Sequence, residues 1–125
     1  MGKEASHRGR VTVVEDDASL LSALAFALEE EGFAVQPYAS AAALLVEPGQ
    51  TDCLVVDLKL PDADGLDLIS ELRGRGVGAP AILITTNPGR RIQARAAAAS
   101  VAIVEKPLIG AELGRRIVAA INGSR

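Results

Sequence analysis

The chain has 125 residues, of which 49% are hydrophobic, and it carries a formal net charge of −3 at pH 7. This length is enough for one domain that buries about two-thirds of its unfolded surface without disulfides or metals, and the hydrophobic content excludes a disordered chain. The small negative charge, with both signs spread along the chain, gives no reason to expect nucleic-acid binding.

The sequence offers little for redox or membrane chemistry. Cys53 is the only cysteine and lies in an apolar run, so we expect a buried, unreactive thiol and exclude a disulfide framework. No apolar run approaches the ~18 residues that a membrane span needs, and the charged N-terminus does not have the pattern of a signal peptide. We therefore expect a cytoplasmic protein that contacts neither membrane nor nucleic acid.

Strands and helices alternate along the chain. Residues 1–9 are polar and unpatterned, and we expect a loose arm in which His7, the only histidine, has no catalytic role. Residues 10–123 are expected to form one domain. Within it, short apolar runs predict strands, which span 11–14, 33–38, 52–56, 80–84 and 101–104. Apolar stripes and capping residues predict helices, which span 18–31, a short stretch after Ser40 that ends before Pro48, 65–74, 88–98 and 111–122.

Capping and turn residues support several of these boundaries. Asp17 is placed to cap the first helix, and Gly32 to end it. Asn87 and Pro88 have the pattern of a cap and a first helical residue for the fourth helix. Five strands that alternate with helices through short loops predict an α/β fold, a single doubly wound (βα)5 domain whose parallel sheet has helices on both faces. We expect the flavodoxin-like strand order 2-1-3-4-5.

Polar side chains stand at the ends of four predicted strands. Glu15 and Asp16 follow the first strand, Asp57 the third, Thr85 the fourth and Lys106 the fifth. The carboxyl ends of parallel strands meet at one edge of the sheet, and the expected order places strands one and three side by side. Three carboxylates this close repel one another unless a cation joins them. Mg²⁺ is a hard cation that binds one or two carboxylates and would relieve this repulsion.

The other two side chains suit a phosphoryl group. Lys106 supplies a positive charge and Thr85 a hydroxyl donor, and both fit the oxygens of a transferred phosphoryl group. A carboxylate, here Asp57, can accept such a group covalently. The residues therefore predict an Mg²⁺-dependent aspartyl-phosphate site.

Each residue also has a purely structural interpretation. Acidic pairs after strands often cap helices, which would account for Asp16, and Glu105 is expected to be a solvated neighbour of the site. Asp62 and Asp64 are expected to be turn and cap residues ahead of Gly65. The argument for a site is that all five polar groups fall at the same end of successive strands.

Four motifs occur in an order typical of one family. They are Val13-Val14-Glu15-Asp16-Asp17, Val55-Val56-Asp57 with Leu60-Pro61-Asp62-Ala63-Asp64-Gly65, Ile82-Leu83-Ile84-Thr85 and Glu105-Lys106-Pro107. With them the chain resembles, over nearly its whole length, the receiver domain of the response regulators of two-component signalling. The resemblance implies that Asp57 accepts a phosphoryl group from a phosphohistidine on a sensor histidine kinase or a histidine phosphotransfer protein.

The resemblance also implies a metal site. Asp16 and Asp57 would bind Mg²⁺ directly, with the backbone carbonyl of Lys59 as a third protein ligand. Glu15 would act through water. The implied cofactor is thus a single Mg²⁺ ion.

Further residues have roles that the resemblance implies. Lys106 would contact the phosphoryl oxygens, and Thr85 would move to hydrogen-bond them and so signal occupancy. Lys59 and Asn87 occupy positions that tune dephosphorylation in the family. Such a domain is a phosphoacceptor for signalling and not an enzyme, since it catalyses only its own phosphotransfer and dephosphorylation.

Three features depart from the family pattern. Ile103 stands three residues before the lysine, where an aromatic residue usually couples to the threonine, and leaves no ring to rotate. Thr86 replaces the usual Ala or Gly after the threonine and adds bulk at the phosphoryl entrance. The helix 88–98 is rich in alanine, and we expect it to shift or fray more readily than its neighbours.

The family usually signals by dimerising or docking through one face, made here by the helix 88–98, the strand 101–104 and the helix 111–122. We expect this face to carry five arginines, which are Arg90, Arg91, Arg95, Arg115 and Arg116. They form either a solvated charged surface or a docking surface for an acidic partner. The expected partners include an unidentified downstream protein and a second copy of the chain in a phosphorylation-dependent homodimer.

Several alternatives stay open at this point. From the end of the chain at Arg125 we expect a single-domain regulator or phosphorelay shuttle, and a receiver fragment of a longer regulator with an effector domain is the alternative. A phosphohydrolase of the haloacid-dehalogenase type would need a second aspartate two residues after Asp57, where Lys59 stands. A nucleotide-binding protein would need a glycine- or hydroxyl-rich phosphate loop after the first strand. A pseudo-receiver that acts only as an interaction module would have lost Asp57 or Lys106.

Overall fold

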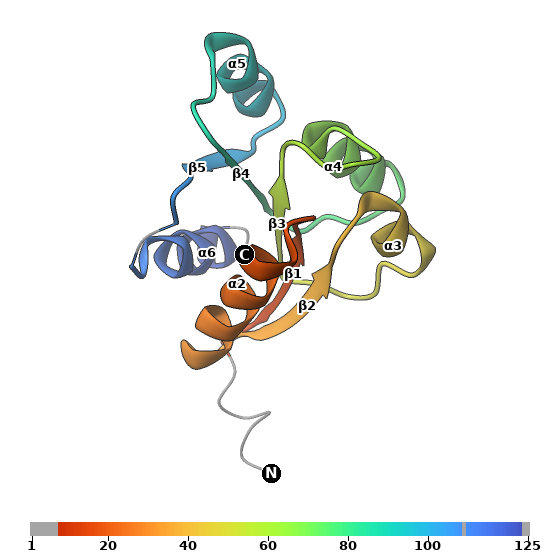
Figure 1. Ribbon diagram of the computed structural model, residues 1–125. Helices are drawn as coiled ribbons and strands as arrows, with labels where there is room; N and C mark the ends of the chain where they lie inside the picture. Colours follow the sequence, from red (N-terminus) through yellow and green to blue (C-terminus); the bar gives the residue numbers. More distant parts are fainter. Residues whose placement is uncertain (1–7, 109, 124–125) are drawn as a thin grey trace.

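The computed structural model describes residues 8–108 and 110–123. Within them, five parallel strands form one sheet in the order β2-β1-β3-β4-β5, with helices on both faces (Figure 1). The elements in chain order are β1 (Arg10–Val14), α2 (Ala18–Glu30), β2 (Ala34–Tyr38), α3 (Ala41–Val46), β3 (Cys53–Asp57), α4 (Gly65–Gly74), β4 (Ala81–Thr85), α5 (Arg90–Ala98), β5 (Ala102–Glu105) and α6 (Glu112–Gly123). The predicted α/β fold and strand order are confirmed.

Two layers of helices cover the sheet. Helices α2 and α6 pack on one face, where Leu28 and Ile117 are buried against β1, β3 and β4. Helices α3, α4 and α5 pack on the other face through Leu44, Leu72 and Ala96. Because both faces are covered, every residue of β3 and β4 is buried, as expected for the central strands of a parallel sheet.

Side chains cap the helices largely where the sequence predicts. Asp17 Oδ1 accepts a hydrogen bond from the N–H of Leu20 at 3.0 Å and so caps α2. The hydroxyl of Ser40 accepts from the N–H of Ala43 at 3.1 Å at the start of α3. Gly32, with φ 101°, follows the end of α2 in the left-handed region that favours glycine. Most other boundaries agree with the prediction to within one or two residues.

The start of α5 differs from the prediction of Asn87 as its cap. The helix begins at Arg90, and Gly89 holds the cap position without a side-chain hydrogen bond. Asn87 has φ 47°, whereas a capping residue needs an extended backbone, so the chain turns at Asn87 before the helix can start. Of the residues of α5, only Ala96 is buried. The expectation that α5 frays more readily than its neighbours stays a prediction.

The N-terminal end of the described chain is tied to the domain. The N–H of Arg8 donates to the carbonyl of Gly32 at 2.7 Å, and the N–H of Ala34 donates to the carbonyl of Gly9 at 2.9 Å. Arg8 and Gly9 therefore differ from the expected loose arm, because they continue the pairing of β1 with β2. Residues 1–7, which include His7, lie outside the described residues.

Two expectations about chemistry elsewhere in the chain can be examined in the structure. Cys53 is buried in β3, and burial raises the pKa of its thiol to about 12, so the thiol is protonated and unreactive at neutral pH. Among residues 8–108 and 110–123, every helix is too short or too polar to cross a membrane.

Candidate functional site

The sheet brings the predicted site residues to one edge. The register between β1 and β3 puts Glu15 next to Asp57, which is the last residue of β3. On the other side of β3, the N–H of Lys106 donates to the carbonyl of Thr85 at 2.9 Å. This bond fixes the segment after β5 beside the end of β4. All four residues thus stand at the carboxyl ends of parallel strands.

Three carboxylates converge at this edge. Glu15, Asp16 and Asp57 each place a carboxylate oxygen within 4.8 Å of the others. Glu15 is 1% exposed and Asp57 is 6% exposed, whereas Asp16 is open to solvent. Like charges at this spacing repel strongly where water is excluded. The arrangement is therefore costly without a compensating positive charge.

Lys106 supplies part of that compensation. Its ammonium nitrogen lies 3.1 Å from Glu15 Oε1 and 3.2 Å from Asp57 Oδ2. Burial acts to lower the pKa of Lys106, but the hydrogen bond to Asp57 and the charges of the two carboxylates outweigh burial and raise that pKa. Lys106 is therefore a fixed cation at neutral pH.

Burial has the opposite consequence for Glu15. It raises the pKa of the Glu15 carboxyl, and the hydrogen bond from the N–H of Asp17 (3.0 Å) and the nearby ammonium of Lys106 only partly offset this. The nearby charge of Asp57 adds to the rise. One positive side chain thus leaves the ionised form of Glu15 incompletely stabilised.

Two carboxylate oxygens at this edge are weakly hydrogen-bonded and so are available to a hard divalent cation. Within residues 8–108 and 110–123, Glu15 Oε1 is buried with no aligned hydrogen-bond donor, although Lys106 lies near it. Asp57 Oδ1 accepts a long hydrogen bond, 3.3 Å, from the N–H of Lys59. Carboxylate and carbonyl oxygens are the ligands that Mg²⁺ prefers. The donor set at this edge therefore fits Mg²⁺.

Thr85 is the last residue of β4 and is 4% exposed. It pairs in the sheet with Glu105, and its carbonyl accepts from Lys106, so its backbone position is tied to that of the lysine. Glu105 itself is exposed, in agreement with its expected place as a solvated neighbour. Lys59 is also exposed, on the segment that follows Asp57.

Gly65 shapes the site, although the sequence suggests only the start of a helix there. A Cβ atom at this position would lie 2.3 Å from the backbone carbonyl oxygen of Asp57. The N–H of Gly65 donates to the carbonyl of Leu58 at 2.7 Å. Helix α4 can therefore begin directly against the backbone of Asp57 only with glycine at its first position. The sequence signal for this contact is a glycine immediately after a capping aspartate, Asp64.

The two aspartates before Gly65 have different roles. Asp64 caps α4, as predicted, by accepting from the N–H of Leu66 at 2.8 Å. Asp62 does not cap α4. It accepts from the N–H groups of Ala41 and Ala42 at 3.0 and 2.8 Å, and these bonds lower the pKa of its carboxyl. Asp62 therefore caps α3, a helix that precedes it in the chain.

The expected arginine surface is only partly present. Arg95 points to α4, where it pairs with Asp64 at 3.0 Å, so it does not belong to the surface of α5, β5 and α6. Arg115 lies beside α2 and lines a hollow of about 340 Å³ with Arg8 and Glu31. Arg116 donates to the carbonyl of Ile103 in β5 at 3.4 Å. Helical periodicity alone does not tell which neighbour an arginine side chain will face.

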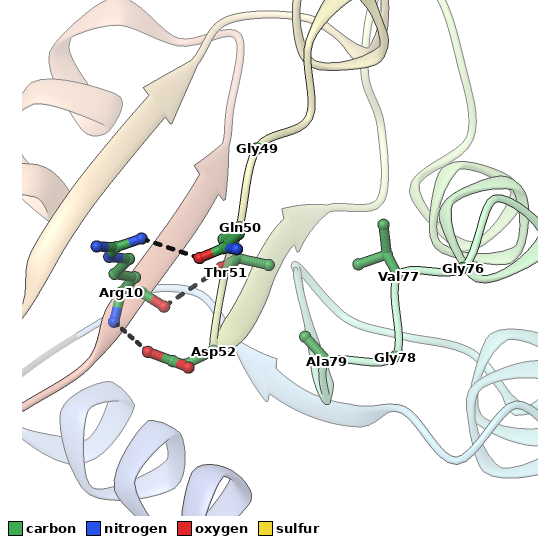
Figure 2. A pocket seen from close by; sticks show the side chains of 9 residues that line it. All are labelled: Arg10, Gly49, Gln50, Thr51, Asp52, Gly76, Val77, Gly78 and Ala79. Carbon is green, nitrogen blue, oxygen red and sulfur yellow. Dashed lines mark hydrogen bonds between the residues drawn. The ribbon is translucent and has the colours of Figure 1, made fainter.

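A second hollow, of about 460 Å³, lies at the opposite edge of the sheet (Figure 2). It is lined by residues just before or at the start of strands and by two loops, which are Arg10, Gly49, Gln50, Thr51, Asp52, Gly76, Val77, Gly78 and Ala79. Asp52 accepts from the N–H of Arg10 at 2.8 Å, and the guanidinium of Arg10 donates to Gln50 at 3.4 Å. The predicted site residues all lie elsewhere.

Comparison with known proteins yields one consistent family. A family model of the response regulator receiver domain matches residues 11–118. The transcriptional regulatory protein FixJ of Azorhizobium caulinodans is 35% identical over 117 residues, which are 91% of this chain and 54% of that protein. Nodulation protein W of Bradyrhizobium diazoefficiens is 35% identical over 125 residues, which are 98% of this chain and 55% of that protein. The chain spans about half the length of these curated relatives.

Solved structures show the same fold. The CheY-like response regulator receiver domain protein of Methanospirillum hungatei has a TM-score of 0.85 and 25% identity, and the match covers 92% of this chain and 94% of that one. Full-length FixJ from B. japonicum has a TM-score of 0.86 and 27% identity, with coverage of 95% and 60%. The five-stranded parallel sheet with helices on both faces thus has close counterparts among solved structures.

Proposed function

The chain belongs to the family of response regulator receiver domains, and from this premise we propose that Asp57 accepts a phosphoryl group from a phosphohistidine. The donor would be a sensor histidine kinase or a histidine phosphotransfer protein. The observation that carries the proposal is the place of Asp57 in the site. It is a buried carboxylate at a strand end, 3.2 Å from the ammonium of Lys106 and clustered with two further carboxylates.

The transfer requires one bond to form and one to break. A carboxylate oxygen of Asp57 forms a bond to phosphorus while the bond between phosphorus and the imidazole nitrogen of the donor breaks. The electron pair stays on that nitrogen, which takes up a proton. Lys106 would offer its charge to the oxygens of the transferred group, and Thr85 would donate its hydroxyl to them.

The residues that would hold Mg²⁺ are Asp16, Asp57 and the carbonyl of Lys59, with Glu15 acting through water. The support for this set is the convergence of three carboxylates and the buried oxygen of Glu15 that has no aligned donor in the described chain. When bound, the ion supplies positive charge that offsets the charge of the carboxylates and of the transferred group.

Two alternatives are less well supported. A hydrolase of the haloacid-dehalogenase type needs a second aspartate where Lys59 stands, and the Lys59 side chain is exposed. A pseudo-receiver without phosphoryl chemistry would not need the buried Asp57 carboxylate beside the half-buried Lys106, because removing these charges from water costs free energy. Tuning of dephosphorylation by Lys59 and Asn87 is part of the proposal.

Occupancy of Asp57 would be signalled through the surface of α5, β5 and α6. Thr85 ends β4, a short segment before α5 begins at Arg90, and β4 pairs with β5 in the sheet. A movement of Thr85 would therefore be passed on to both α5 and β5. Because Ile103 stands where the family usually has an aromatic residue, this signal would not involve a rotating ring. Docking of a downstream protein or a phosphorylation-dependent homodimer would be the output. Both a single-domain regulator and the receiver of a longer transcriptional regulator fit this proposal. The cytoplasmic location and the domain bounds 10–123 stay predictions.

Intact-mass analysis tests the proposal. The wild-type chain is incubated with acetyl phosphate and Mg²⁺ beside an Asp57→Asn variant, which keeps the size of the side chain but removes the nucleophilic carboxylate. We expect one phosphoryl adduct on the wild type, its loss after chelation of Mg²⁺ before the reaction, and none on the variant. No adduct on the wild type, or an equal adduct on the variant, would contradict the proposal.

A further inference from the structure

The segment 58–64, which joins Asp57 to α4, folds back on itself. Lys59 and Asp64 form an isolated antiparallel bridge. Inside it, the N–H of Leu60 donates to the carbonyl of Ala63 at 3.2 Å. We call residues 59–64 the acceptor turn. Because Lys59 is bridged to Asp64, the position of the Lys59 backbone follows the position of Asp64.

Asp64 is held from α5. Arg95 NH1 lies 3.0 Å from Asp64 Oδ2, and its NH2 lies 3.3 Å from Asp64 Oδ1. The guanidinium group thus binds one carboxylate in a bidentate manner. NH2 also lies 3.2 Å from Asp67 Oδ1. The two side chains of the main pair are 37% and 34% exposed, and their two-armed geometry fixes orientation as well as distance.

The acceptor turn is held from the other flank as well. Each carboxylate oxygen of Asp62 accepts one of the first N–H groups of α3, from Ala41 and Ala42. Ser40 takes the next N–H group. A carboxylate at a helix N-terminus is favoured by the unpaired N–H groups and the helix dipole. The turn is thus anchored to α3 by Asp62 and to α5 by Arg95.

These two anchors act on the turn that contains a proposed metal ligand. We propose that Arg95 and Asp62 are positioning residues for the Mg²⁺ site: by clamping the acceptor turn from α5 and α3, they hold the carbonyl of Lys59 for the ion. The inference rests on the proposed function, which assigns Lys59 to the metal. Groups that orient metal ligands without touching the metal set its affinity, because an unclamped turn must be ordered when the ion binds.

The inference makes a calorimetric prediction on the unphosphorylated chain. Titration with Mg²⁺ at pH 7 should give a dissociation constant on the order of 10-fold higher for Arg95→Ala and for Asp62→Ala than for the wild type, which is the lower end of what removal of such orienting groups costs. Arg95→Lys keeps the charge but loses the second arm, so it should fall between. Arg75→Ala is the matched control: at the C-terminal end of α4 it removes an exposed pair with Glu71 at 2.9 Å and a hydrogen bond to the carbonyl of Leu45 at 3.3 Å. Both contacts leave the acceptor turn untouched, so this variant should keep the wild-type constant.

A kinetic measurement separates positioning from general damage. In phosphorylation by acetyl phosphate, the Mg²⁺ concentration for half-maximal rate should rise in Arg95→Ala and Asp62→Ala, while the rate at saturating Mg²⁺ should stay near that of the wild type. A fall in the saturated rate with no change in half-saturation would overturn the inference, as would wild-type Mg²⁺ affinity in both variants. If Arg95→Ala folds poorly, the Mg²⁺ affinities of Arg95→Lys and of the loop variant Asp62→Ala test the inference in its place.

The outcomes distinguish this inference from the proposed function. A wild type that binds Mg²⁺ but takes up no phosphoryl group removes the proposed function and leaves the calorimetric comparison valid. A wild type that is phosphorylated, with variants of unchanged Mg²⁺ affinity, removes only the role of the clamp. A wild type that binds no Mg²⁺ removes both.

Discussion

The two edges of the sheet carry similar types of polar residue, but these residues are exposed at one edge and buried at the other. At the amino edge, Arg10, Gln50 and Asp52 line an open hollow, and Arg10 donates hydrogen bonds to the other two where water reaches them (Figure 2). At the carboxyl edge, Glu15 and Asp57 are almost fully buried and share the single ammonium of Lys106. Burial, more than the number of charges, separates a solvated loop surface from a site that can bind a cation or a phosphoryl group.

The difference follows from how a parallel sheet is connected. At the carboxyl edge, the segments after β1 and β3 lead to opposite faces of the sheet, to α2 on one and α4 on the other, which leaves space between them for a site. Here Glu15 and Asp57 leave β1 and β3 at that point, and α4 begins against the backbone of Asp57. The comparison therefore predicts that equivalent substitutions at the two edges have unequal effects.

The largest effect is expected from removing the shared cation. Lys106→Met leaves Glu15 and Asp57 buried without a positive partner, and we expect the free energy of unfolding at pH 7 without Mg²⁺ to fall by about 2–3 kcal/mol. The matched substitution at the amino edge, Arg10→Met, removes an exposed charge and should change it by less than about 0.5 kcal/mol. Urea unfolding of the three chains measures both. Equal losses at the two edges would remove the contrast.

A somewhat smaller effect is expected from one added methyl group. Gly65→Ala places a Cβ atom 2.3 Å from the carbonyl oxygen of Asp57, and the backbone shift should cost about 1–3 kcal/mol of stability. It should also slow phosphorylation by acetyl phosphate, because the reacting carboxylate moves with its backbone.

Gly78→Ala, in the hollow of the amino edge, is the control for Gly65→Ala. Its Cβ would meet nothing within 4 Å among the described residues, so this variant should unfold at the wild-type urea concentration or slightly above it and should be phosphorylated at the wild-type rate. Tolerance of alanine at Gly65, with rate and stability unchanged, would show that α4 does not constrain Asp57.

The smallest effect concerns pH and the Asp64–Arg95 pair. Burial alone would raise the pKa of Asp64, but the hydrogen bonds and charge of Arg95, together with hydrogen bonds from the backbone N–H groups of Asp67 and Leu66, outweigh it and lower that pKa below its ordinary value of 3.8. The pair therefore stabilises the fold above pH 3.8, and its contribution is lost as the pH falls through the lower folded value. The difference in urea midpoint between wild type and Arg95→Ala should be present at pH 6 and shrink toward pH 3. A difference that does not depend on pH would show that Arg95 acts through packing alone.

Much of the fold could be predicted from the sequence because its signals are local. Alternation of apolar runs with helical stripes is enough for a parallel sheet, and Asp17 and Ser40 mark helix starts that the structure has. The start of α5 could not be predicted in this way. Asn87 is a good capping residue and also one of the few residues that tolerate a positive φ, and the turn before α5 uses the second property.

The candidate site likewise has a part that local sequence signals predict and a part that depends on tertiary packing. The strand order alone places five site residues at one edge, because each is the last residue of a strand or follows a strand within two residues. These residues are Glu15, Asp16, Asp57, Thr85 and Lys106. The contacts of Gly65, Asp62 and Arg95 depend on how helices pack against loops far away in the sequence. Arg95, for example, was expected on the surface of α5, β5 and α6, but its carboxylate partner lies 31 positions earlier in the chain. Such pairings need the tertiary structure.

Peptide mapping of the phosphorylated chain tests the central claim most directly. The wild type is treated with acetyl phosphate and Mg²⁺, the acyl phosphate is trapped by reduction, and the modified residue is located by mass spectrometry. We predict modification at Asp57 alone, since it is the carboxylate held by Lys106 at the end of β3. Modification at Glu15 or Asp16 instead, or an unmodified chain, would contradict the assignment of Asp57 as the phosphoacceptor.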